Sequence, residues 1–286
     1  MSAEQTVKRA APDTSSARAP SPGSATQSTH PKPITDITVE HGPADLLGRF
    51  FLKADTAARQ RGVTLSFGTF EELLQINGQN RDSWKPLTTI YDFRTCPRGL
   101  APDRALCILG RDERGKVVAT HAARVFEITD ENTLYDVAVS LRLFYDDPEK
   151  MKNPGERCEV TAGIAKSIRG KLLVNGAVWY HPAYRKRDMA RIIPRIARAY
   201  AYTRWKIDHS MGIVIESADN TRIIDRLGYP YREWDLKLIN SSMGNGRCCL
   251  AWMHADQLLS DLDSWLAGFD AEVDRGVHDR RAQQQG

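Results

Sequence analysis

The segment that most constrains the fold lies between residues 172 and 217. Leu172–Tyr180 is an apolar run broken only near its middle, and turn residues bound it on both sides. Such a run predicts a strand buried on both faces of a sheet. Apolar residues then recur at helical spacing over Met189–Tyr200, and Met211–Ser217 is a second apolar run. This order predicts a strand–helix–strand unit and therefore a mixed α/β domain.

The rest of the chain predicts further elements around this unit. Thr69 precedes two acidic residues and an apolar pair, which is typical of a helix N-cap. The segment Arg111–Gly115 separates two apolar runs and predicts a hairpin. In chain order we expect helices from about Pro43 to Gly62 and from Thr69 to Gly78, strands at 88–93, 105–109 and 116–126, a helix at 132–145, and, after the central unit, a helix at 219–227, a strand at 231–240 and a helix ending at Gly268.

The two ends of the chain differ in composition from its middle. Residues 1–40 are rich in Pro, Ser, Thr and Ala and hold few apolar side chains, so we expect this tail to be disordered. No amphipathic helix pattern supports a transit peptide there. We expect one domain over residues 41–270 and a polar C-terminal tail over 271–286.

Composition and cysteine spacing narrow the class of protein. No apolar run approaches the ~18–20 residues that span a bilayer, and no signal-peptide pattern opens the chain, so no membrane partner is expected. The five cysteines show no metal-ligand spacing, and their odd number disfavours a disulfide framework. We therefore expect reduced thiols, no metal site and a cytoplasmic location.

The turn that follows the first apolar strand carries the chemistry. A helix N-terminus offers unpaired backbone N–H groups and a partial positive charge, which together make an anion site. Here Arg185, Lys186, Arg187 and Arg191 surround that terminus. The local excess of basic residues suits a phosphate-bearing ligand, a nucleic acid or an acidic partner. A solvated helix face is the simpler alternative for the residues further along the helix.

At this turn the sequence resembles the GNAT superfamily of N-acetyltransferases. Its acyl-CoA motif is a strand followed by [Arg/Gln]-x-x-Gly-x-[Gly/Ala], which Arg185 opens and Ala190 closes. Downstream, Ile215–Asn220 and Leu227–Tyr229 resemble the family's next strand, its Asn-initiated helix and the Leu-Gly-aromatic that ends it. The resemblance covers residues 172–232, and the first 130 residues match only in the order of elements.

The resemblance implies a fold, a cosubstrate and a reaction. The fold is a central, mostly antiparallel sheet with one splayed parallel strand pair, flanked by helices. The cosubstrate is acetyl-CoA or another acyl-CoA, and the acceptor is a small-molecule or protein amine that attacks the thioester directly with general-base assistance. The resemblance is also compatible with a homodimer. The residues it implies for cofactor binding are Val178, Tyr180, Arg185, Lys186, Arg187, Asp188, Met189, Ala190 and Asn220, with the oxyanion polarised by a backbone N–H near Tyr180.

Two positions depart from the family pattern. Asp188 stands where the motif has its central Gly, so its carboxylate either obstructs the phosphate or caps the helix, or else points away. Ile224 stands where the family has the Tyr that protonates the leaving thiolate. Tyr229 lies nearby and is the candidate replacement, although a core role is the alternative.

The candidate general base is Glu216, a lone carboxylate at the end of an apolar strand, where burial would raise its pKa. The alternative is a structural carboxylate paired with an Arg. His181 is a second candidate base, with a structural role in its turn as the alternative. Trp179 and Tyr180 are candidates for lining the acceptor pocket, with alternation sending one of them into the core.

Two other classes of function compete with the enzyme. Arg191, Arg195 and Arg198 alternate with aromatic residues, as in proteins that bind nucleic acid, but those aromatics share the apolar helix face, which argues against that function. A GNAT-fold module that binds a ligand or partner without catalysis is the second alternative, because of Asp188 and Ile224.

Overall fold

The computed structural model describes residues 32–216 and 223–284. Its centre is an eight-stranded sheet in the order β1-β2-β3-β5-β6-β8-β7-β4. All neighbouring strands are antiparallel except β5 and β6, which are parallel. The strands are β1 (Thr64–Phe67), β2 (Ala105–Arg111), β3 (Val117–Ile128), β4 (Arg157–Val160), β5 (Gly170–Tyr180), β6 (His209–Ile215), β7 (Tyr231–Ile239) and β8 (Gly246–His254).

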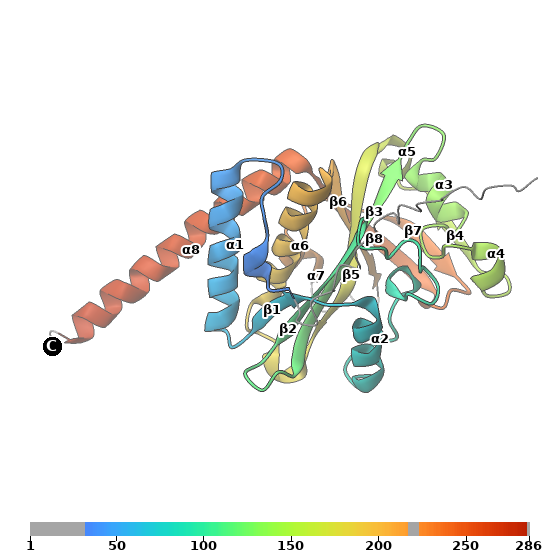
Figure 1. Ribbon diagram of the computed structural model, residues 1–286. Coiled ribbons are helices and arrows are strands. Elements are labelled where there is room, and N and C mark those ends of the chain that lie inside the picture. The colour runs from blue at the N-terminus through green and yellow to red at the C-terminus, as the bar shows by residue number, and fades with distance from the viewer. Residues whose placement is uncertain (1–31, 217–222, 285–286) are drawn as a thin grey trace, which may run out of the picture. The chain divides into compact units, whose positions relative to one another are not determined.

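Helices cover both faces of the sheet, and each face has its own apolar core (Figure 1). One face carries α1 (Ala44–Gln60), α6 (Met189–Trp205) and α8 (Ala255–Gln284). The other carries α2 (Phe70–Gln79), α3 (Leu134–Val139), α4 (Pro148–Met151) and α5 (Ile164–Ser167), while α7 (Ile223–Leu227) packs against α6. Three short 3-10 turns complete the described elements: η1 (Ile34–Asp36), η2 (Thr89–Tyr91) and η3 (Pro182–Tyr184).

The parallel pair splays, as the GNAT resemblance predicts. β5 and β6 pair only from Leu172 with His209 to Asn175 with Gly212. Beyond that point β5 keeps its partner β3, with an irregularity where Ala177 takes a positive φ of 49°. The edge of Gly176–Tyr180 that faces β6 is therefore unpaired by any described strand. The predicted fold class, a mostly antiparallel mixed sheet with one splayed parallel pair and flanking helices, is confirmed.

Several predicted elements are confirmed at the level of single contacts. Thr69 caps α2, with its side chain accepting a hydrogen bond from the Glu72 N–H at 3.1 Å. Asp112–Gly115 closes the hairpin between β2 and β3, with Gly115 at a φ of 77°. All five cysteines are buried and none of them forms a disulfide, which agrees with the prediction of reduced thiols.

Other predictions were wrong. The expected strand at 88–93 is the buried turn η2, and the expected helix at 132–145 is helical only over Leu134–Val139. Three strands were not predicted: β1 and β4 have four residues each, and the apolar run of β8 fits a buried helix as well as a strand. α8 continues past Gly268, where the sequence predicted its end.

The boundary of the ordered part also needs correction. Ile34 is completely buried and Pro33 bridges to Ser66, so structure begins before residue 41. The first 31 residues of the tail that was predicted to be disordered lie outside the described residues. None of the helices in the described part of the chain has both the length and the apolarity to cross a membrane.

Candidate active site

The site begins with the open half of the splay. The residues that line it, Gly176–Val178 on β5 and Ile213–Ile215 on β6, are only partly buried although most are apolar. Strands in the middle of a sheet normally bury such residues against a neighbouring strand. The splay therefore leaves a gap between two central strands, lined by apolar side chains and by unpaired backbone groups of β5. An extended ligand with amide groups can pair with such an edge.

Two tyrosines close the inner end of the splay, one from each face of the sheet. On the α2 face, Tyr91 donates a hydrogen bond to the Val174 carbonyl at 3.1 Å. Its ring occupies the place of a side chain on Gly176, where an added Cβ would lie 2.5 Å from Tyr91 Cε2. Burial raises the pKa of Tyr91 well above its ordinary value. Gly176 is thus the position at which the chain makes room for Tyr91.

Tyr229 closes the splay from the α6 face. Its ring packs over Gly212, which is the last residue of β6 that pairs with β5. An added Cβ on Gly212 would lie 3.3 Å from Tyr229 Cε2. Its hydroxyl lies 3.3 Å from Ser210 Oγ, and the Arg198 guanidinium lies 5.0 Å from the ring centre. Burial raises the pKa of Tyr229, and the charge of Arg198 opposes that shift. The structure thus places this predicted catalytic residue at the closed end of the splay.

The predicted anion site lies where β5 leads into α6. Lys186 and Asp188 both have positive φ, 65° and 60°. Within the described residues, none of the backbone N–H groups from Lys186 to Ala190 donates to an acceptor in the protein. A left-handed residue followed by helical ones turns successive N–H groups toward one point, which makes an anion-binding concavity. We call residues 186–190 the N–H cradle.

Asp188 does not fill this cradle. Its side chain makes no capping hydrogen bond to α6, although it occupies the N-cap position. The carboxylate is about half exposed and lies 3.6 Å from Arg191 Nε. The backbone takes the left-handed conformation that a Gly would favour, which Asp tolerates better than most residues. The alternative in which Asp188 caps the helix is therefore wrong, and the negative charge of its carboxylate lies beside the cradle.

The basic side chains of the cradle mostly bind the protein itself. Arg185 donates to the carbonyls of Tyr180 and Ser83, each at 3.2 Å. Arg187 donates to the Arg61 carbonyl at 3.0 Å and stacks on the Tyr184 ring at 4.2 Å. These contacts hold the loop in shape. A cavity of about 690 Å³ lies outside the splay, between this loop, the end of α1 and the β2–β3 hairpin, and is lined by Arg59, Gln60, Arg61, Gly62, Glu113, Lys186, Arg187 and Asp188.

The other predicted cofactor residues are distributed unevenly. Val178 lies in the open half of the splay and is partly exposed. Tyr180 is partly exposed as a residue, but its hydroxyl is buried and has no partner in the described structure, so burial raises its pKa. Met189 is a core residue of the α6 face, and Ala190 is partly buried. Asn220 lies outside the described residues.

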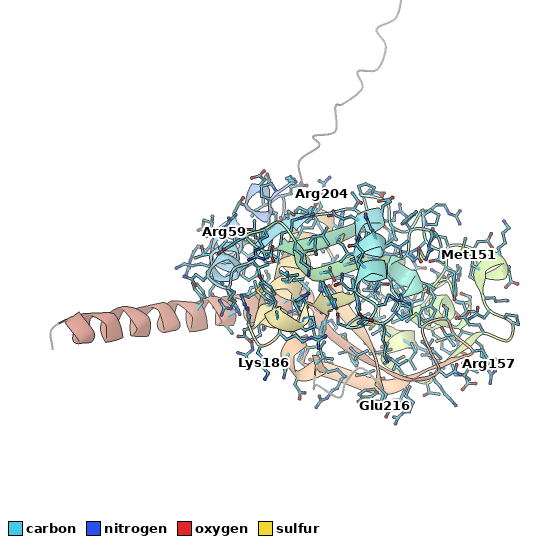
Figure 2. All side chains as sticks on the ribbon, turned by 90° about the horizontal axis from the view of Figure 1, so that it is seen from below. Arg59, Met151, Arg157, Lys186, Arg204 and Glu216 are labelled. Carbon is cyan, nitrogen blue, oxygen red and sulfur yellow. The ribbon has the colours of Figure 1, made fainter. Side chains whose placement is uncertain are left out.

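The two candidate bases have different surroundings. Glu216 follows β6 directly, but its side chain is 60% exposed and lies 3.9 Å from Arg247, so the burial expected there is absent. In Figure 2, Glu216 and Lys186 are both labelled on the lower side of the molecule. His181 accepts a hydrogen bond from the Ala183 N–H through Nδ1 at 3.3 Å, as a capping residue does. Partial burial and then Lys116 lower the pKa of His181.

Sequence reasoning missed a buried polar cluster behind Tyr229. His121 Nε2 lies 3.1 Å from Asn175 Oδ1, and Asn175 Nδ2 lies 3.0 Å from Ser210 Oγ. His121 is completely buried, which lowers its pKa to about 4. Arg198 completes the cluster and is also completely buried. The one signal in the sequence was Asn175, a polar residue inside an otherwise apolar strand.

Of the three arginines that suggested nucleic-acid binding, Arg191 is exposed, whereas Arg195 and Arg198 are largely or fully buried. Arg195 lies 2.7 Å from Asp261 of α8 with a side chain 11% exposed, and Arg198 lies 3.5 Å from the same carboxylate. The aromatic residues that follow them on the same helix, Tyr200, Tyr202 and Trp205, pack against the α6-face core. Within the described residues, no group of three or more His, Cys, Asp or Glu side chains is arranged to hold a metal ion.

Comparison with known proteins finds similar chains among solved structures. NAA60 from Arabidopsis thaliana in complex with acetyl-CoA is 10% identical, with a TM-score of 0.44 over 68% of this chain and 99% of that one. Spermidine N-acetyltransferase from Vibrio cholerae in complex with CoA and spermine is 11% identical, with a TM-score of 0.40 over 69% and 98%. The aminoglycoside acetyltransferase AAC(6')-Ib in complex with coenzyme A is 12% identical, with a TM-score of 0.39 over 69% and 97%. No family profile and no curated protein matches the chain.

Proposed function

We propose that this protein is a GNAT-type N-acyltransferase that uses acetyl-CoA or another acyl-CoA to acylate an amine. The observation that carries the proposal is the continuity between the splay and the N–H cradle. The unpaired edge of Gly176–Tyr180 leads, through the short turn η3, into the free N–H groups of residues 186–190. A long ligand with amide groups in its arm and a pyrophosphate at one end fits such a sequence of partners.

Each part of the chain then has a role in the transfer. The β5 edge, including Val178 and Tyr180, pairs with the amides of the pantetheine arm, and the cradle holds the pyrophosphate. The irregularity at Ala177 turns backbone N–H groups out of the strand pattern, so they are the candidate donors to the oxyanion. The amine attacks the thioester carbonyl, the carbon–sulfur bond breaks, and Tyr229 gives its proton to the departing thiolate.

Glu216 is the proposed base that removes the proton of the attacking amine. Its carboxylate stands at the mouth of the splay, exposed and near Arg247. We expect Glu216→Gln to lower kcat about 100-fold with little change in acetyl-CoA affinity. Glu159→Gln, an exposed carboxylate on β4, is the matched control. Unchanged turnover in Glu216→Gln would show that this assignment is wrong.

The walls of the open splay support an acceptor with an apolar body. On the α2 face, Ala177, Ile213, Ile215, Met243 and Trp84 are partly exposed and pack against the core. The indole of Trp84 stacks on Trp179 at 5.3 Å between ring centres. A polycation gains little from apolar walls, whereas an aromatic or aliphatic amine buries surface against them. The five cysteines, none of which forms a disulfide, support a reducing compartment, and so the cytoplasm, as the place where the enzyme works.

A binding module without catalysis is the second candidate function. It is favoured by the charge of Asp188 beside the cradle and by Ile224, which is 3% exposed and offers no acid at the family's usual position. In such a module acyl-CoA binds but is not consumed. The two functions therefore separate cleanly in an experiment that measures binding and thiol release independently.

The experiment adds acetyl-CoA to the purified protein and follows thermal unfolding. A ligand that binds only the native state at 100 times its Kd adds about 2.7 kcal/mol of stability, which raises Tm by several degrees in a protein of this size. No shift at millimolar acetyl-CoA or longer acyl-CoA would end the proposal. With binding established, release of free CoA is measured over a panel of amines. We expect aromatic and aliphatic monoamines to be acylated faster than the polycations spermidine or an aminoglycoside.

A further inference from the structure

The buried cluster behind Tyr229 has a defined direction of hydrogen bonding, which follows from Asn175. The amide nitrogen of Asn175 lies near two backbone carbonyls, 3.2 Å from Met211 O and 3.4 Å from Leu173 O. Carbonyl oxygens only accept hydrogen bonds, so the NH₂ end of the amide must face them. The amide oxygen therefore faces His121. This assigns the orientation of a group whose O and N atoms look alike.

The orientation of Asn175 fixes the proton on His121. Because the Asn175 oxygen accepts, His121 Nε2 must carry a hydrogen and donate it across 3.1 Å. Nδ1 then has no proton in the neutral ring, and it is buried without a partner in the described structure. Full burial lowers the pKa of His121 to about 4, so the ring is neutral near pH 7.

The next link sets the direction at Ser210. Asn175 Nδ2 donates to Ser210 Oγ at 3.0 Å. Ser210 is 1% exposed, and the remaining neighbour recorded for its hydroxyl in the described residues is Tyr229 Oη at 3.3 Å. A buried hydroxyl proton needs an acceptor. Ser210 therefore donates to Tyr229, and the phenol oxygen accepts.

These steps lead to one inference. We propose that His121, Asn175 and Ser210 are positioning residues that form a one-way chain of donors ending at the Tyr229 oxygen, and so leave the Tyr229 proton directed into the splay. The proposal rests on the proposed function, in which Tyr229 protonates the departing thiolate. It goes beyond that function because it assigns residues that do not touch the substrate.

The same series of hydrogen bonds also stabilises the negative charge that remains on Tyr229 after the proton transfer. When the Tyr229 O–H bond breaks, its proton joins the thiolate sulfur and the oxygen keeps the electron pair as a phenolate. Ser210 already donates to that oxygen, and the cation of Arg198 lies 5.0 Å from the ring centre. Both favour the phenolate over a phenol in the same site. Solvent then returns a proton to Tyr229 before the next turnover.

The variant Ser210→Ala tests this series of hydrogen bonds and should destabilise the fold little. The substitution removes the donor to Tyr229, while Asn175 Nδ2 keeps its two carbonyl acceptors, so no buried donor is orphaned. We expect kcat to fall about 10-fold with unchanged acetyl-CoA affinity, and Tyr229→Phe to lower it about 100-fold. Because both act through one oxygen, the double variant should be no slower than Tyr229→Phe alone. Ser210→Thr should restore activity, and Ser66→Ala, a buried serine at the sheet edge, is the matched control.

A measurement without ligand keeps this proposal separate from the proposed function. Tyrosine labelled with ¹³C at Cζ is titrated by NMR, and the Tyr229 signal is identified by its loss in Tyr229→Phe. In Ser210→Ala the pKa of Tyr229 should rise, because the phenolate loses the hydrogen bond from Ser210. The other groups that face Tyr229, which are Asn175, Arg198 and Tyr91, are unchanged. Nitrogen-15 shifts of His121 should show the Nε2–H tautomer. An unmoved Tyr229 titration, a proton on Nδ1, or additive losses in the double variant would each overturn the chain. Absence of acetyl-CoA binding would instead remove the proposed function and leave these readouts intact.

Discussion

The N–H cradle and the closed end of the splay are joined by one strand, β5, yet they are built in opposite ways. The cradle is exposed, and the groups that would bind an anion are backbone N–H groups left free by two left-handed residues. The closed end is buried, and its useful groups are side chains that hydrogen-bond one another. Backbone donors at a helix start need little support from distant residues. A buried polar cluster depends on its side-chain partners, because a substitution that leaves a buried donor or acceptor unsatisfied is costly.

Because of this difference, we expect mutations in the two regions to affect different properties, namely stability in one and ligand binding in the other. Changes at the closed end should alter the free energy of unfolding, since charges and hydrogen bonds there are desolvated. Changes at the cradle should alter ligand affinity and leave stability nearly unchanged, since its side chains are largely exposed. The comparison fails if either region behaves like the other.

The largest effect on the free energy of unfolding is expected for Asp261→Asn. Asp261 is the carboxylate near both Arg195 and Arg198, and the Arg198 side chain is 1% exposed. Removing the carboxylate charge leaves a buried cation uncompensated, which costs about 4 kcal/mol of unfolding free energy. Urea unfolding measures this without the screening that guanidinium salt would add. Asp263→Asn, an exposed residue on the same helix, should change stability by less than about 0.5 kcal/mol. Equal effects of the two variants would refute the assignment of Arg198 as a buried, compensated charge.

The next effect is a pH dependence centred on His121. Its pKa is lowered to about 4 in the folded protein, against 6.5 in the unfolded chain. The unfolded state therefore binds the extra proton between these values, and stability falls as pH drops from 6.5 toward 4. The full difference is about 3 kcal/mol, at 1.36 kcal/mol per pKa unit. His121→Gln keeps a donor for Asn175 but does not titrate, so the variant should lose this part of the pH dependence.

Parallel unfolding curves of wild type and His121→Gln between pH 4 and 6.5 would contradict that prediction. The comparison of the two proteins is needed because His209, which approaches His254 at 2.9 Å, also has its pKa lowered by burial and contributes in the same direction. Both proteins contain that pair, so it cancels in the difference.

The contrast between the two regions also explains what the sequence could predict of the fold. The central strands and α6 were predictable because long apolar runs and helical spacing are local properties of the chain. β1 and β4, with four residues each, are too short to show a period. The turn at Thr89–Tyr91 resembles a strand in composition because it is buried, and burial there comes from packing against distant residues.

The two halves of the site also differ in how far the sequence predicts them. The cradle follows from a basic turn before a helix, so the sequence located it. The His121, Asn175 and Ser210 side chains come from three different strands and meet only through the register of the sheet. Arg198 looked like a polar-face residue by helical spacing, because spacing alone does not show that α8 and the end of α7 cover that face. Tyr229 was identified by resemblance, and its partners were not.

The smallest expected effect returns to the cradle and concerns Asp188. Its carboxylate is the one feature there that opposes an anionic ligand. Asp188→Asn removes the charge and keeps a side chain that tolerates a φ of 60°. Asp188→Gly removes the charge and suits that φ without restriction. We expect both to tighten acetyl-CoA binding about fivefold, worth roughly 1 kcal/mol, and to leave unfolding nearly unchanged.

Calorimetric titration with acetyl-CoA at low and high salt measures this effect, because an interaction between exposed charges shrinks as salt is added. Glu113→Gln is the matched control, since Glu113 lines the neighbouring cavity from the β2–β3 hairpin but stands outside the cradle. If charge alone matters, Asn and Gly at position 188 behave alike. If Gly binds more tightly than Asn, the side chain also restricts the approach of the ligand to the N–H groups. Weaker binding in both variants would mean that the carboxylate orders the cradle through Arg191, and the cradle would then depend on side chains as the closed end does.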